Sequence, residues 1–242
     1  MLFKINLFSK DFVYTLHCGA QQQLKSKALD LDALPSIALL KSKFFTLYRS
    51  DRIDVLNKND ILLIEEHFKC LLRKSTYSSF EVPLLVANNL DFFAIIENYE
   101  LDKTVINLLE KLNKQKCLMV GYFHGDLWHP NILKNDSKYY LIDYDRCRRF
   151  FLPQLDIVHF LLFNNFFSVP NPSWNDILSH ARSDVFLDKL VQFFELDLSM
   201  VNDLVTIYLI TTFAQNEVKF KKSIKYLRWV RSRCLFMQAI HG

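Results

Sequence analysis

An eight-residue stretch from His124 to Asn131, H-G-D-L-W-H-P-N, constrains this chain more than any other feature. It places a carboxylate, Asp126, five residues before an amide, and a second carboxylate, Asp143, follows twelve residues after that amide. Between the two, the pattern predicts a tight hairpin and a strand, Tyr139–Ile142, that brings the chain back to the loop. We therefore expect Asp126, Asn131 and Asp143 to meet at one site.

Side chains of these types in this order suit phosphoryl transfer. One carboxylate can orient an acceptor hydroxyl and take its proton. An amide oxygen and a second carboxylate can hold Mg²⁺ against the phosphates, because this hard cation prefers oxygen ligands. The chemistry therefore predicts a base, Asp126, and two metal ligands, Asn131 and Asp143.

The segments H-G-D-L-W-H-P-N-I-L and Y-Y-L-I-D-Y-D resemble the aminoglycoside phosphotransferase and choline kinase superfamily, which are small-molecule kinases with the protein-kinase-like fold. The Leu127-Trp128 pair is similar to the fructosamine kinase branch. The resemblance covers about residues 120–160, with Pro130 where the family usually has a small Gly. It implies a set of roles: catalytic base Asp126, Mg²⁺ ligands Asn131 and Asp143, structural loop histidine His124, and loop-bracing carboxylate Asp156.

The nucleotide-binding part of the family matches less closely. Gly19 is the only glycine in the first 120 residues, so the sequence has no Gly-rich phosphate loop. The apolar run that ends at Lys41 is similar to the strand that carries the nucleotide-binding lysine, with Lys43 as the alternative. Its partner would be Glu65 or Glu66 in the next predicted helix. The other interpretation, a surface lysine at a strand end, stays open.

The order of predicted elements, a strand-rich small lobe followed by a helix-rich large lobe, indicates an α+β fold. The resemblance implies that this fold is the protein-kinase-like, two-lobed one. We expect a strand-rich nucleotide-binding lobe at residues 1–100 and a helical catalytic and acceptor lobe at residues 101–242. Nucleotide would sit between the lobes, with Phe92–Tyr99 as the connecting hinge. The elements predicted in the first lobe are strands at Leu2–Phe8, Phe12–Cys18 and Ile37–Tyr48, a helix at Asn59–Lys74, and a hairpin-like pair, Val82–Ala87 and Phe92–Glu97, joined at Asn88-Asn89.

Helical periodicity dominates the second half. The helices expected there are Thr104–Met119, Ile157–Phe167, Val185–Phe194, Val201–Val218 and Ile224–Ile240. Trp128 and the phenylalanines at 160, 163, 166 and 167 are interpreted as core. For Arg146, Arg148 and Arg149, contact with an anionic ligand and a structural or solvated role are equally open.

Composition and charge indicate which kinds of ligand and which cellular location fit the chain. The formal net charge of +4 fits anionic ligands such as nucleotides and does not require nucleic acid. The basic residues between Lys219 and Arg233 allow peripheral membrane contact through a C-terminal helix, although a solvated helix face is favoured. Five scattered cysteines without a C-x-x-C pair, together with no apolar run long enough to be a signal peptide or to span a membrane, predict a cytoplasmic protein.

These observations converge on an ATP- and Mg²⁺-dependent phosphotransferase. The acceptor would be a hydroxyl of a small molecule or sugar, including sugars of surface polysaccharides. The alternative is a pseudokinase or binding module of the same fold that has lost turnover, which the missing Gly-rich loop favours and the retained Asp126, Asn131 and Asp143 oppose.

Overall fold

Strands come first along the chain and helices dominate its later part, which agrees with the predicted α+β class. A computed structural model describes residues 2–6, 38–41, 46–50, 54–56, 58–74, 80–135, 138–141, 146–166, 169 and 173–216. The two-lobed arrangement and the boundary near residue 100 stay predictions.

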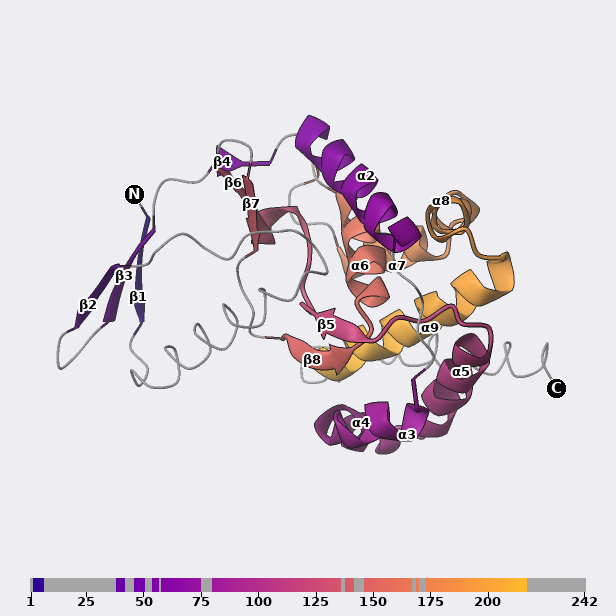
Figure 1. Cartoon of the computed structure of the whole chain (residues 1–242). Coiled ribbons are helices and arrows are strands. Elements are labelled where there is room, and N and C mark those ends of the chain that lie inside the picture. Colours follow the sequence, from indigo (N-terminus) through magenta and orange to yellow (C-terminus); the bar gives the residue numbers. More distant parts are fainter. Residues whose placement is uncertain are drawn as a thin grey trace.

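Three strands near the N-terminus form an antiparallel sheet (Figure 1). Its strands are β1 (Leu2–Asn6), β2 (Ala38–Lys41) and β3 (Thr46–Ser50), in the order β1-β3-β2. The first predicted strand is therefore confirmed. The predicted extended stretch Ile37–Tyr48 is two strands rather than one, because β2 and β3 pair with each other. The predicted strand Phe12–Cys18 lies outside the described residues.

Two further small sheets surround the motif loop. β4 (Asp54–Val55), β6 (Ile132–Asn135) and β7 (Lys138–Leu141) form one of them, and β6 and β7 make the tight hairpin that the sequence predicts. β5 (Gly121–Phe123) pairs antiparallel with β8 (Arg148–Phe151) in the other. Neither β5 nor β8 was predicted, because each is too short to show a period of two.

Helix α2 (Lys58–Lys74) confirms the helix predicted from residue 59. Ile61, Ile64 and Phe68 are buried along one face, as the periodicity predicts. This face contacts α6 (Gln154–Asn164) and α8 (Asp184–Phe194). Helix α2 therefore packs on helices that lie a hundred residues later in the chain.

The predicted hairpin at Asn88-Asn89 is wrong, since both flanking runs are helices: α3 (Val82–Ala87) and α4 (Leu90–Glu97). Pro83 occupies the first turn of α3, a position where a missing N–H costs nothing. The Asn88 and Asn89 side chains donate back to carbonyls of α3 and so end it. The expected hinge, Phe92–Tyr99, lies largely in α4, which packs against later helices, and its role as a connection between lobes stays a prediction.

The remaining helices enclose the core. They are α5 (Asp102–Lys114), α6, α7 (Trp174–Ala181), α8 and α9 (Leu198–Gln215), of which only α7 was not predicted. Helix α9 is buried on nearly every side because it contacts α4, α5, α6 and α8 (Figure 1). None of the helices among the described residues is long and apolar enough to cross a membrane. The predicted helix Ile224–Ile240 and its basic stretch lie outside the described residues.

Candidate active site

The motif loop leaves β5 and is anchored in the core at both ends. Phe123 and Leu127 are buried, so the three residues between them are held as a short arch. A single turn of 3₁₀ helix follows at His129–Asn131, with Pro130 in its first positions, and leads into β6. Proline fixes its own φ near the value that such a turn needs, which accounts for its place in the motif.

Asp156, in the first turn of α6, binds the backbone of the motif loop. Its carboxylate accepts the backbone N–H of His124 at 2.6 Å and that of Gly125 at 2.8 Å. Burial raises the pKa of this carboxyl to about 8, although the two backbone donors act in the opposite direction. These contacts support the predicted bracing role of Asp156. His124 is also buried, and its Nδ1 accepts the backbone N–H of Asp126 at 3.3 Å.

Gly125 is the tightest point of the loop. Its φ of +84° lies in the left-handed region, which a side chain rarely adopts. A Cβ at this position would lie 2.6 Å from the backbone oxygen of Arg146 and 2.8 Å from the amide nitrogen of Gln215. The loop can therefore approach the chain after β7, and the end of α9, only with a glycine here.

Asp126 and Asn131 face each other across the loop. The Asn131 amide nitrogen donates to the backbone oxygen of Asp126 at 2.8 Å and to its Oδ2 at 3.2 Å. The amide is thereby oriented with its nitrogen toward Asp126 and its oxygen away from it. Two residues that the sequence predicts to share a site are thus in direct contact.

His159 of α6 also reaches Asp126, and the sequence analysis missed it. Its Nε2 lies 3.4 Å from Asp126 Oδ1, and its Nδ1 lies 2.8 Å from the hydroxyl of Tyr208 on α9. The imidazole stacks on Phe163 with ring centroids 4.4 Å apart. Nothing local marks His159 in the sequence, since it sits inside an apolar helix 33 residues after the motif aspartate.

Neighbouring groups set the charge of Asp126. Burial alone would raise the pKa of the Asp126 carboxyl, but His159, Arg146 and His124 outweigh it and hold that pKa below its usual range. Arg146 itself donates from Nη2 to the Asn216 side chain at the end of α9, at 2.9 Å. Asp126 is consequently a carboxylate at neutral pH.

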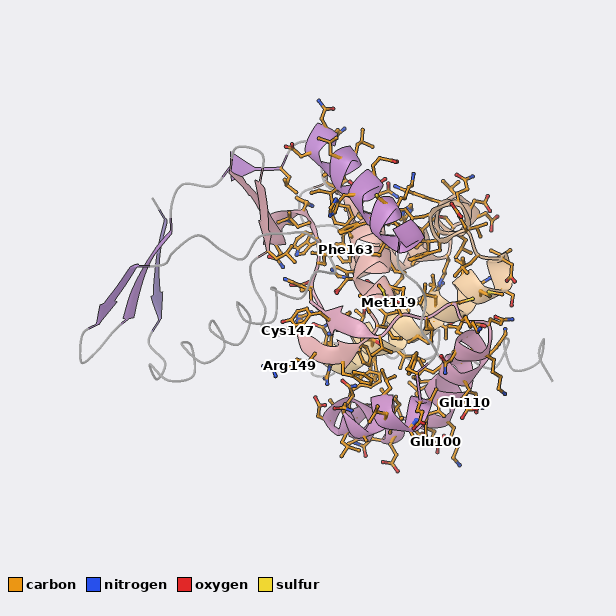
Figure 2. All side chains as sticks on the ribbon, viewed as in Figure 1. Glu100, Glu110, Met119, Cys147, Arg149 and Phe163 are labelled. Atoms are coloured by element: carbon orange, nitrogen blue, oxygen red, sulfur yellow. The ribbon has the colours of Figure 1, made fainter. Side chains whose placement is uncertain are left out.

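The three arginines that follow the predicted metal ligand Asp143 in the sequence, Arg146, Arg148 and Arg149, differ in their surroundings. Arg148 forms a bidentate ion pair with Asp91 of α4, with both N···O distances 2.7 Å, so its role is structural. Arg146 lies close enough to Asp126 to lower the pKa of that carboxyl. Arg149 is an exposed residue of β8, and Figure 2 shows its label close to that of Cys147. Trp128 packs edge-on against Phe163, as expected of a core residue.

The predicted nucleotide-binding residues are only partly described. Glu65 is buried, and its Oε1 accepts hydrogen bonds from Asn164 of α6 and, at 3.0 Å, from Lys189 of α8. Glu66 is paired with Lys69. The backbone of Lys41 ends β2, but its side chain lies outside the described residues, so a contact between Lys41 and either glutamate stays a prediction.

The metal site is likewise described only in part. The predicted ligand Asp143 lies outside the described residues. In the part of the chain that the structure does describe, no group of three or more His, Cys, Asp or Glu side chains could hold a metal ion. The assignments of Asn131 and Asp143 as metal ligands therefore both stay predictions.

The chain was compared with protein-family models, with curated proteins and with solved structures. No family model matches the chain, and no curated protein matches it. Among solved structures, a protein assigned as a fructosamine-3-kinase from Haemophilus somnus 129PT aligns with a TM-score of 0.52 and 14% identity over 97% of this chain and 82% of that one. An ethanolamine kinase from Plasmodium vivax aligns with a TM-score of 0.51 and 13% identity over 97% of this chain and 75% of that one. The chain therefore shares the fold of these two structures, in agreement with the resemblance that the motif residues carry.

Proposed function

We propose that this protein is a phosphotransferase that moves the γ-phosphoryl group of ATP, with Mg²⁺, to a hydroxyl of a small molecule or sugar. The observation that carries the proposal is the geometry of the motif loop. Asp126 is ionised and contacts Asn131. It lies in a loop whose backbone donates two hydrogen bonds to Asp156. Shared fold alone would not give this function, because one fold can host many activities.

Asp126 supplies the chemistry at the acceptor. An ionised carboxylate can accept the hydrogen bond of an incoming hydroxyl, align its oxygen with the phosphorus, and take the proton as the new P–O bond forms. The low pKa makes Asp126 a weak base. That suits phosphoryl transfer, in which positioning and electrostatic stabilisation contribute more than early proton removal.

The residues present fit a magnesium ion. Because the Asn131 nitrogen is committed to Asp126, its amide oxygen is turned away and can serve as a hard ligand. Asp143, two residues after β7 in the sequence, would supply the carboxylate ligand. Mg²⁺, when bound, neutralises the charge of the phosphates during transfer.

The acceptor is a small molecule or sugar. Two structures that share the fold are named for kinases of small molecules, which supports this class. On the buried side of Asp126, α6 contributes His159, which Tyr208 of α9 contacts in turn, so the acceptor would approach Asp126 from its other side.

Calorimetry with ATP and MgCl₂, followed by an assay of phosphate transfer or release, tests the proposal. We expect ATP binding, slow turnover on water, and faster turnover with a matching acceptor. Asp126→Asn should lower turnover by about a hundredfold to ten-thousandfold with little change in ATP affinity, because the base touches the acceptor. Asp188→Asn, an exposed carboxylate on α8, is the matched control and should leave turnover unchanged.

Two results would contradict the proposal. ATP binding without any turnover would leave a binding module of the same fold. Equal turnover in wild type and Asp126→Asn would remove Asp126 from the reaction.

A further inference from the structure

His159 is a buried histidine with a contact at each ring nitrogen. Only 8% of its surface is exposed, and its ring stacks on the ring of Phe163. A buried imidazole is unfavourable unless its polar atoms are satisfied, so its two contacts matter. One is the Tyr208 hydroxyl at Nδ1, and the other is Asp126 Oδ1 at Nε2.

These two contacts determine where the imidazole proton lies. If Nδ1 carried it, Nε2 would turn a lone pair toward a carboxylate oxygen, which is repulsive. If Nε2 carries it, Nδ1 accepts the proton of the Tyr208 hydroxyl and Nε2–H points at Asp126. Thr212 forms a side-chain hydrogen bond with Tyr208, so the phenol can accept from Thr212 while it donates to His159.

The distances agree with this direction. Nε2 is buried and makes no hydrogen bond of ordinary geometry among the described residues, and the structure places Asp126 Oδ1 beside it. The separation of 3.4 Å exceeds an ordinary hydrogen bond, as contacts of a catalytic site often do before the substrate is bound.

We infer that His159 is a positioning residue, which donates from Nε2 to Asp126 Oδ1 and is itself oriented by Tyr208. The inference rests on the proposed function and deepens it. Asp126 then has one oxygen directed by Asn131 and the other by His159, so its carboxylate cannot rotate freely. A fixed carboxylate presents its remaining lone pairs to the acceptor hydroxyl in one direction.

The tautomer can be measured without any nucleotide. Long-range ¹H–¹⁵N spectra of the full chain, labelled with ¹⁵N in the histidine rings, distinguish the Nε2–H form from the Nδ1–H form. The His159 signal is assigned by its loss in His159→Gln. We expect the Nε2–H form in wild type at neutral pH and a mixture of tautomers in Tyr208→Phe. An Nδ1–H form or a mixture in wild type would overturn the inference.

Two matched substitutions separate positioning from packing. The amide nitrogen of glutamine overlies Nε2, so His159→Gln keeps a donor toward Asp126. The shorter amide of asparagine overlies Nδ1, so His159→Asn keeps only the Tyr208 partner. With ATP and Mg²⁺ as the probe and phosphate release as the readout, we expect kcat within about threefold of wild type for Gln and about ten- to a hundredfold lower for Asn.

ATP affinity should be unchanged in both variants, because His159 contacts the carboxylate and not the nucleotide. Equal kcat for the Gln and Asn variants, whether both normal or both low, would overturn positioning by the Nε2 donor. If wild type itself has no turnover, the proposed function fails, and the tautomer measurement alone decides the inference.

Discussion

Gly125→Ala should destabilise the protein more than any other single methyl group added to the motif loop. A non-glycine residue at a φ of +84° costs about 1–2 kcal/mol. The new Cβ would also lie 2.6 Å from the backbone oxygen of Arg146 and 2.8 Å from its Cβ. Backbone atoms cannot swing aside as the tip of a lysine can, so relief requires a shift of the loop at about 1–3 kcal/mol.

The two costs together give about 2–5 kcal/mol, a large part of the 5–15 kcal/mol that typically separates folded from unfolded domains. Urea unfolding followed by circular dichroism measures the change through the midpoint and its slope. Gly121→Ala is the matched control, because its Cβ would meet only Pro153 Cγ, at 3.9 Å. We expect that variant within about 1 kcal/mol of wild type. Equal midpoints for the two variants would refute the reasoning from loop geometry.

Two further predictions concern contacts outside the loop. The pKa of Asp91 is lowered chiefly by its hydrogen bonds from Arg148. The extra stability of wild type over Asp91→Asn should therefore be complete above the usual pKa of 3.8 and should disappear as the pH falls through the lower pKa of the folded state. Urea midpoints of both proteins between about pH 6 and pH 2 measure this difference in stability, and a difference that does not change with pH would contradict the prediction. Ser173 caps α7 by accepting the N–H of Asp176, while Ser179 is exposed in the same helix. Ser173→Ala should therefore cost about 1 kcal/mol in thermal or urea unfolding and Ser179→Ala close to nothing, and equal costs would contradict the capping assignment.

Long amphipathic elements were predictable from the sequence because their pattern repeats over several turns. Helix α5 buries Val105, Leu108, Leu109 and Leu112, the four residues that the period of 3.6 selects. The β6–β7 hairpin follows in the same way from a turn between two apolar runs. The same signal fails for α3 and α4, which have six and eight residues. An apolar run of that length fits a strand or a buried helix equally well.

The residues of the candidate site also differ in how far the sequence predicts them, and the difference depends on whether their contacts are local. Asp126 and Asn131 are five residues apart, so local sequence is enough to place them together. Asp156 could be proposed only through the family resemblance, because its contacts span about thirty residues. His159 and Tyr208 carry no local mark at all. His159 reaches Asp126, and Tyr208 reaches His159, only because α6 packs against both the motif loop and α9, which is a property of the tertiary fold.

Helix α2 connects the nucleotide-binding prediction to this helical packing. Phe68 of α2 meets Phe160 of α6 edge to face at 5.4 Å, and Glu65, one turn earlier, is held by Asn164 and Lys189. Helix α2 is thereby fixed to α8 and to α6, the helix that carries Asp156 and His159. Any residue of α2 that meets the nucleotide would be positioned by the helical body, and not by the N-terminal sheet alone. Glu65 has one carboxylate oxygen, Oε1, in these contacts, so a lysine partner would have to approach its Oε2. A second partner there would link the sheet to α2, α6 and α8 through one buried side chain.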